Sequence, residues 1–206
     1  MPPFVNKILD LSAAFGLYDW WAARNLEGVH DTLIGLANIQ GHEEILDVGC
    51  GTGIIGYRLV KAFDGIMFRG VDVGKQMIAI AERRLGEHYP SVEYTVGTAV
   101  RLPYANGQFD VTTSCLVFHL LRDSDKELAL WEIFRILKPG GRYVCAEFAK
   151  YPAGLSCRAL LTYPSYLIDR VGFHVHAQHE GPSITKCRSI VYRVLTKPAG
   201  AMLPAS

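Results

Sequence analysis

The 206-residue sequence lacks a strong excess of charge, a CxxC pair and any long uninterrupted run of hydrophobic residues. Its 21 Lys and Arg against 20 Asp and Glu leave a net charge of +1, so no overall basic field indicates a nucleic-acid partner. Five cysteines, an odd number, argue against a disulfide framework or a structural zinc site and favour a reducing, cytoplasmic setting. Because the apolar runs are short and the first ten residues lack the regions of a secretory signal, we expect neither a transmembrane helix nor a leader.

Hydrophobic residues make up half of the chain and charged residues only 20%. This is enough apolar material for a full core, and it excludes an intrinsically disordered protein. At about 150 residues per domain, the length predicts one domain, which we place at residues 1–197. Residues 198–206 are expected to form a frayed tail.

Strand-like runs alternate with longer helical runs as far as residue 148. The helical runs have apolar residues spaced for one face, as at Met77, Ala81 and Leu85, and the KPGG sequence at Lys138–Gly141 is expected to end the last of them. This alternation is typical of an α/β protein with a mostly parallel sheet. The predicted strands are Glu44–Val48, Ile66–Asp72, Val92–Val96, Phe109–Cys115 and Arg142–Phe148.

Both ends of the chain depart from this alternation. Ala159–Val171 reads as a helix, and His174–Glu180 and Ser189–Thr196 read as two strands joined by a Gly-Pro loop. Two strands so joined form an antiparallel hairpin rather than another βαβ unit, so the sheet should be mixed. Ahead of the first strand, Val5–Leu36 has a helical pattern that predicts a cover over the sheet or over a ligand.

Three alternating glycines follow directly on the first predicted strand and precede the helical run Ile54–Phe63. Glycine suits this place because the chain must turn tightly and a ligand must approach the backbone. Read from Gly51, the letters GTGIIG match the dinucleotide fingerprint GxGxxG, which would end the strand at Cys50 and leave Gly49 unexplained. Read from Gly49, the motif is D-x-G-x-G-x-G, and Asp47 then suits a cationic ammonium group. The second reading accounts for more residues, and we prefer it.

The second predicted strand ends in Asp72, about twenty residues after the glycine loop. A carboxylate at this place can accept hydrogen bonds from both ribose hydroxyls of an adenosine. The alternative is that Asp72 is the N-cap of the following helix. The two roles do not exclude each other.

Together these segments resemble the class I S-adenosylmethionine-dependent methyltransferases, within the group that includes quinone-ring C-methyltransferases. The resemblance covers about residues 15–196. It implies a Rossmann-like three-layer sandwich with a seven-stranded, mostly parallel sheet and the antiparallel C-terminal hairpin at one edge. It rests on ILDVGCGTG at Ile45–Gly53, GVDVGKQMIAIAERR at Gly70–Arg84, LPYANGQFDVTTSCLVFHLL at Leu102–Leu121 and EIFRILKPGGRYVCAEF at Glu132–Phe148.

The resemblance implies a binding site for S-adenosylmethionine and a division of the chain. Residues 1–40 would form an N-terminal helical cap, 44–148 the cofactor-binding core, and 159–197 the C-terminal helix and hairpin. The loop would hold the methionine part of the cofactor near Asp47, Asp72 would bind the ribose, and the next turn would wall the adenine. The implied residues are Asp47, Gly49, Cys50, Gly51, Thr52, Gly53, Asp72, Val73 and Met77.

Further implied contacts come from three other segments. Thr98 and Ala99 replace an Asp-Ala pair that the family often places beside the adenine amino group, and a threonine accepts a hydrogen bond more weakly than a carboxylate. Cys115 and Leu116 would face the sulfonium at the end of the fourth strand. Tyr18 would fold over the cofactor.

We expect in-line methyl transfer to a small or medium, apolar or aromatic acceptor. His119 is the candidate general base if the acceptor must lose a proton, and otherwise a wall residue beside the cofactor. The HVHAQH run matches no familiar metal-ligand spacing, so no metal is expected. Two alternatives stay open, an NAD(P)-binding oxidoreductase and a cofactor-binding but catalytically silent partner subunit. Neither the atom that is methylated nor the oligomeric state follows from the sequence.

Overall fold

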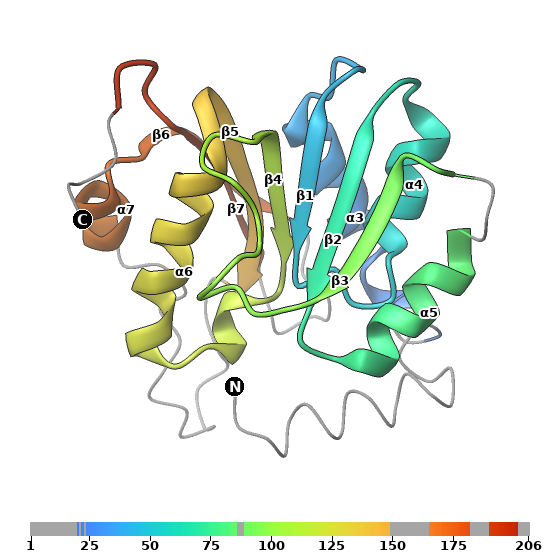
Figure 1. Ribbon diagram of the computed structural model, residues 1–206. Helices are drawn as coiled ribbons and strands as arrows, with labels where there is room; N and C mark the ends of the chain where they lie inside the picture. The colour runs from blue at the N-terminus through green and yellow to red at the C-terminus, as the bar shows by residue number, and fades with distance from the viewer. Residues whose placement is uncertain are drawn as a thin grey trace, which may run out of the picture.

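The computed structural model describes residues 20, 22, 24–85, 89–148, 165–181 and 190–201 of the chain. Its centre is a seven-stranded sheet in the order β3-β2-β1-β4-β5-β7-β6 (Figure 1). β1 to β5 form the parallel part of the sheet, whereas β7 is antiparallel to both β5 and β6. The strands are β1 Glu44–Val48, β2 Met67–Asp72, β3 Val92–Val96, β4 Phe109–Cys115, β5 Leu137–Phe148, β6 His174–Gly181 and β7 Ile190–Thr196.

Helices cover both faces of the sheet, which gives three layers. One face packs against α3 and α4, and its apolar core includes Ile45, Phe68 and Val144. The other packs against α6 and α7, with Leu46 and Tyr143 in its core. The helices are α3 Glu27–Ala37, α4 Ile54–Ala62, α5 Lys75–Leu85, the 3₁₀ turn η2 Phe118–Leu120, α6 Asp123–Ile136 and α7 Ser165–Val171. The predicted mixed α/β sandwich with its antiparallel C-terminal strands is confirmed.

The chain order reverses between β1 and β4, which lie side by side at the centre of the sheet. From β1 the strands run outward to β2 and β3 on one side, and from β4 they run to β5 on the other. In open parallel sheets, ligands bind in the crevice outside the carboxyl ends of the strands at such a switch point. The loops after β1 and β4 are therefore the first candidates for a ligand site.

Most predicted strand boundaries are correct to within one residue, but β5 begins five residues earlier than predicted. The KPGG sequence follows the end of α6, as predicted. It lies inside β5 rather than ahead of it, because Leu137 already pairs with Phe109 of β4. A register shift between Phe109 and Val111 then carries the chain past Gly140, which has a φ of +81°. α4 ends at Ala62 rather than at the predicted Phe63.

Two predicted helical segments are only partly described. Of the N-terminal run, the structure describes α3 and, before it, helical residues at positions 20, 22, 24 and 25, with a turn at Leu26. Of the C-terminal helix it contains α7 from Ser165 onward. No helix within the described ranges combines the length and the apolar character needed to cross a membrane.

Candidate ligand site at the carboxyl ends of the central strands

The glycine loop begins where β1 ends, at Val48. Gly49, Gly51 and Gly53 all have positive φ angles, of 73°, 53° and 76°, which residues with a Cβ rarely adopt. A strand that ends at Val48 fits the D-x-G-x-G-x-G reading, since the dinucleotide phase requires the strand to continue to Cys50. At Gly49 a Cβ would also lie 2.3 Å from a methyl group of Val117, in the turn after β4. The loops after β1 and β4 are thus in contact.

Gly53 is required by packing as well as by backbone conformation. It precedes α4, and a Cβ there would lie 2.6 Å from the Tyr94 hydroxyl and 2.8 Å from the Cβ of Ala81. A Cβ at Gly70 would meet the same Tyr94 ring at 2.5 Å. Tyr94 therefore fills a slot between α4, α5 and β2 that only glycines leave open. Sequence reasoning did not identify Tyr94, although glycine at positions 53 and 70 is the signal of a large neighbour.

The carboxylate of Asp72 connects the glycine loop to the turn after β2. One oxygen accepts a hydrogen bond from the Gly51 N–H at 3.0 Å, and the other accepts one from the Gly74 N–H at 2.8 Å. α5 begins at Lys75, so the N-cap position belongs to Gly74 and the N-cap alternative for Asp72 is wrong. The side chain instead holds two loops together at the carboxyl edge of the sheet.

Asp47 lies inside the sheet layer, with only 1% of its surface exposed. Thr113 on β4 donates a hydrogen bond of 2.7 Å to its carboxylate. Burial raises the pKa of Asp47 to about 7, and the nearby charge of Asp72 acts in the same direction. A cation placed beside Asp47 would favour its ionised form, and an anion would oppose it.

Arg84, near the end of α5, fixes Thr52 of the glycine loop. Its Nε donates to the Thr52 carbonyl at 2.8 Å, and an Nη donates to the Thr52 hydroxyl at 3.4 Å. Sequence reasoning did not single out Arg84. Its spacing of seven residues from Met77 places the two on the same face of α5, and that is the signal that identifies it.

The loop between β3 and β4 carries the predicted adenine contacts. Ala99 and Met77 are buried, whereas Val73 is 41% exposed at the carboxyl edge of β2. The Thr98 hydroxyl accepts a hydrogen bond from the Val100 N–H at 3.5 Å, and Thr98 forms a short bridge with Arg101. The structure thus places one polar and three apolar side chains within the segments that border the glycine loop.

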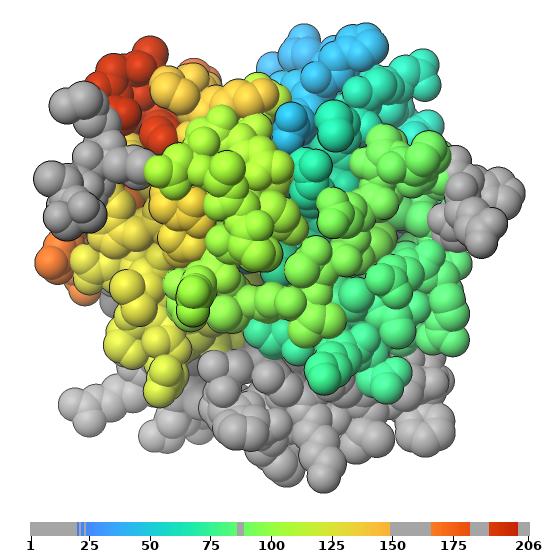
Figure 2. All heavy atoms as spheres, viewed as in Figure 1, coloured from blue at the N-terminus to red at the C-terminus, as the bar shows by residue number. Residues whose placement is uncertain are grey.

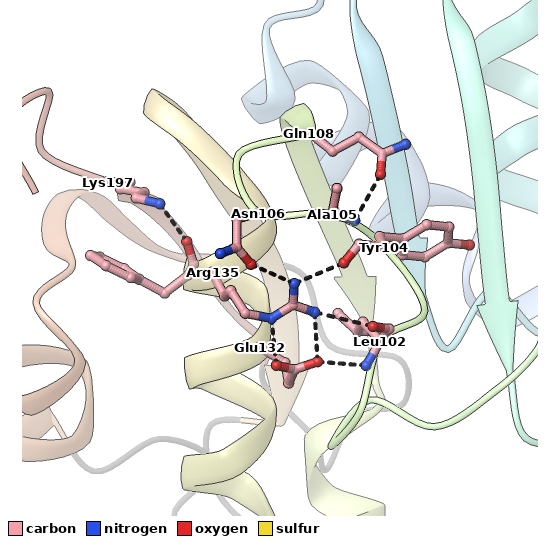
Figure 3. Close-up of polar contacts among 9 residues, drawn as sticks. Leu102, Tyr104, Ala105, Asn106, Gln108, Glu132, Arg135 and Lys197 are labelled. Atoms are coloured by element: carbon pink, nitrogen blue, oxygen red, sulfur yellow. Dashed lines mark hydrogen bonds and ion pairs between the residues drawn. The ribbon is translucent and has the colours of Figure 1, made fainter. Parts of the chain in front are cut away.

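Two side chains of α6 hold this loop from behind (Figure 3). Arg135 donates two hydrogen bonds to the carboxylate of Glu132, at 2.7 and 2.9 Å. It also donates to the carbonyls of Tyr104 and Leu102 and to the Asn106 side chain, at 2.7, 3.1 and 2.8 Å. Glu132 accepts the Leu102 N–H at 2.6 Å in return. We call this pair the Arg135–Glu132 clamp.

The turn after β4 brings two further predicted residues to the loops. Cys115 ends the strand, and burial raises the pKa of its thiol well above the usual range. Leu116 follows with a φ of +56°, an uncommon conformation for a residue with a Cβ. His119 lies in η2, with 14% of its side chain exposed, and its ring contacts Phe148 edge-on with centroids 5.0 Å apart.

This turn is held by Glu147 of β5, which sequence reasoning did not identify. The carboxylate is fully buried and accepts the N–H groups of Val117 and Phe118 at 2.8 and 2.7 Å. Its other oxygen lies 3.4 Å from Nδ1 of His119. Glu147 is the second-last residue of β5. No local sequence pattern indicates its role, because its partners are about 30 residues earlier in the chain.

The remaining predictions concern residues at the margin of the described structure. Tyr18 lies outside the described residues. Within the described ranges, no three His, Cys, Asp or Glu side chains gather in an arrangement that could hold a metal ion. The space-filling view shows the segment between β3 and β4, in yellow-green, at the surface in the centre of the face that it presents (Figure 2).

Comparison with known proteins gives a consistent result. Residues 45–141 match a family described as methyltransferase domain. The chain is 33% identical over 128 residues to a demethylmenaquinone methyltransferase of Deinococcus radiodurans. The aligned region covers 62% of this chain and 52% of that protein. The chain thus spans about half the length of the curated relatives it matches.

Solved structures give the same fold. A phosphoethanolamine N-methyltransferase of Haemonchus contortus in complex with S-adenosyl-L-methionine is 16% identical with a TM-score of 0.74, over 92% of this chain and 57% of that one. A TehB-like methyltransferase of Corynebacterium glutamicum is 26% identical with a TM-score of 0.68, over 91% and 98% of the two chains.

Proposed function

Residues 45–141 match the family described as methyltransferase domain, and from this similarity we propose that the chain transfers a methyl group from S-adenosylmethionine to an apolar, aromatic small molecule. The observation that carries the proposal is the loop after β1. It starts with glycine at the end of the strand, and the carboxylate of Asp72 is bonded to its Gly51 N–H. No nucleic acid or metal is part of the proposed reaction.

The residues present suit this cofactor. Ribose hydroxyls are hydrogen-bond donors, and Asp72 supplies an acceptor at the carboxyl edge of β2. The ammonium group of the cofactor is a cation, which beside Asp47 would offset the burial that raises the pKa of Asp47. The pyrophosphate of a dinucleotide is an anion and would be repelled there. The half-exposed Val73 and the buried Met77 supply apolar surface for the adenine.

The cofactor supplies an electrophilic methyl group on a sulfonium sulfur. The residues of the chain hold and align the reactants, which can contribute on the order of 7–11 kcal/mol to the lowering of the barrier. His119, in the turn after β4, carries an imidazole, whose unprotonated ring nitrogen can accept a proton from an acceptor. It acts when the acceptor must lose a proton, as a hydroquinone hydroxyl does.

An aromatic, apolar acceptor is supported by the relatives, which are named as methyltransferases of demethylmenaquinone and of ubiquinone and menaquinone biosynthesis. The acceptor to test first is therefore a reduced naphthoquinone with a short prenyl chain. A catechol and phosphoethanolamine serve as comparison acceptors, since the fold alone does not define the substrate.

Calorimetric titration with S-adenosylhomocysteine tests the cofactor, with NAD in parallel. We expect micromolar binding, about −8 kcal/mol, and no binding of NAD. Asp72→Ala should abolish the binding, and Asp169→Ala, an exposed aspartate on α7, is the matched control that should retain it. Binding of NAD alone would favour the oxidoreductase. Binding of S-adenosylhomocysteine without methyl transfer to any acceptor would favour the catalytically silent subunit.

A further inference from the structure

The turn after β4 depends on one buried carboxylate. Glu147 is fully buried, and both of its oxygens face hydrogen-bond donors of residues 117–119. Oε1 accepts two backbone N–H groups, and Oε2 faces Nδ1 of His119. A buried carboxylate is costly unless its hydrogen-bonding capacity is used, and here this turn uses it.

The shape of this turn is strained, and the contacts with Glu147 offset the strain. Leu116 has a φ of +56°, a left-handed conformation that is strained for a residue with a Cβ. The conformation directs successive N–H groups of Val117 and Phe118 at a single oxygen of Glu147. Strained residues of this kind persist where the surrounding contacts over-determine them, and they gather at functional sites.

We propose that Glu147 is a positioning residue, which holds the turn after β4 and fixes His119 in the tautomer whose proton is on Nδ1. The proposal rests on the proposed function for the identity of the proton donor, but the tautomer itself does not depend on it. Nε2 of His119 is then the ring nitrogen that carries the lone pair.

The tautomer follows from the chemistry of the contact. An ionised carboxylate only accepts hydrogen bonds, so the ring nitrogen beside it must be the donor. In a neutral imidazole one nitrogen is protonated and the other is not, so a proton on Nδ1 leaves Nε2 as the acceptor. Within the described part of the chain, Nε2 has no hydrogen-bond partner. The edge-on contact with Phe148 limits rotation of the ring in addition.

The proton step conserves atoms and charge. The O–H bond of an acceptor hydroxyl breaks and leaves its electron pair on the oxygen, while a new N–H bond forms at Nε2. The imidazolium cation so produced lies beside the Glu147 carboxylate, which stabilises it. Solvent later removes the proton from Nε2 and restores the neutral ring.

Glu147→Gln tests the tautomer with little change in shape. The two backbone N–H groups require the amide oxygen at the Oε1 position, so the NH₂ group takes the position of Oε2. This group only donates, and therefore Nδ1 must become the acceptor and the proton must move to Nε2. The turn is retained, but the nitrogen that should accept the proton no longer has a lone pair.

The measurement is two-bond ¹⁵N–¹H correlation spectroscopy of ¹⁵N-histidine-labelled protein under alkaline conditions, where neutral imidazoles dominate. The seven histidines are resolved by the loss of one signal set in His119→Asn. We expect Nε2 of His119 to be unprotonated in the unsubstituted chain and protonated in Glu147→Gln. Glu180→Gln on the exposed strand β6 is the matched control and should leave the spectrum of His119 unchanged.

Activity provides the second measurement. With the short-chain naphthoquinol, Glu147→Gln should lower kcat by about 10²–10⁴-fold, the range of general acid–base catalysis. The Kd of S-adenosylhomocysteine should stay within about threefold. A protonated Nε2 in the unsubstituted chain would overturn the proposal even if the variant fails to fold, as would an unchanged tautomer in Glu147→Gln. Absence of S-adenosylhomocysteine binding would instead count against the proposed function and leave the tautomer result standing.

Discussion

Arg135→Lys should lower the free energy of unfolding by about 2–4 kcal/mol, although the substitution keeps the charge. An arginine side chain has five N–H donors, and Arg135 uses all five, for Glu132 twice and for Leu102, Tyr104 and Asn106. A lysine has three donors at a single nitrogen. At least two hydrogen bonds of the Arg135–Glu132 clamp are therefore lost.

The magnitude follows from the environment of the clamp. The side chains of Arg135 and Glu132 are only 24% and 19% exposed, so solvent replaces the lost bonds poorly. A hydrogen bond that involves a charged group contributes about 1.5–3 kcal/mol, and a neutral one about 0.5–1.5 kcal/mol. Two lost bonds, with a carbonyl left without its partner, give the expected 2–4 kcal/mol.

Urea denaturation followed by circular dichroism measures this difference. Arg170→Lys is the matched control, because Arg170 pairs with Glu127 at the surface and should change the free energy by less than about 0.5 kcal/mol. The clamp holds the loop that carries Thr98, so the affinity for S-adenosylhomocysteine should also fall, by about tenfold or 1.4 kcal/mol. Equal stability of Arg135→Lys and Arg170→Lys would refute the reasoning.

Three further predictions concern the glycine loop and its neighbours. Gly49→Ala should cost about 2–5 kcal/mol in urea denaturation, because φ is +73° and a Cβ would collide with the next turn, whereas Gly28→Ala, with open space around it, should be neutral or stabilising. Arg84→Met removes the donors to the loop and should cost about 1–3 kcal/mol in thermal denaturation, whereas Arg83→Met should cost less than about 0.5; equal losses would contradict the assigned role. Because the pKa of Asp47 is raised to about 7 in the folded chain, its contribution to stability is present at low pH and is lost as the pH rises from about 4 through 7. Asp47→Asn should therefore gain stability relative to the unsubstituted chain over that range, by up to about 4 kcal/mol at 1.36 kcal/mol per pKa unit, and a constant difference would refute this.

The sheet was predictable where the pattern of each strand is local. β1, β3 and β4 have the predicted bounds, because each is a short apolar run between turn signals. The start of β5 was not predictable in this way. Its first residue, Leu137, is placed by pairing with Phe109 across a register shift, and no local pattern encodes that contact.

The residues of the candidate site also differ in whether a local sequence pattern predicts them. The glycine loop and Asp72 were predictable, because the chemistry of a ligand-binding turn requires those residue types next to a strand. Glu147 and Arg135 were not, because their partners lie about 30 residues away along the chain. Their function exists only after the sheet and α6 have brought distant segments together. The contacts that position a site are in this respect harder to predict than the residues that form it.

The place of β7 has a consequence for the synthesis of this protein. β7 follows β6 in the chain but lies between β5 and β6, with antiparallel pairing to both. Until residues 190–196 leave the ribosome, β5 presents an unpaired edge, and β6 lacks β7, its partner among the described strands. Unpaired edges of this kind promote association between chains. The sheet is therefore complete only after β7 has been translated. A nascent chain arrested before β7 should need a chaperone to remain in solution.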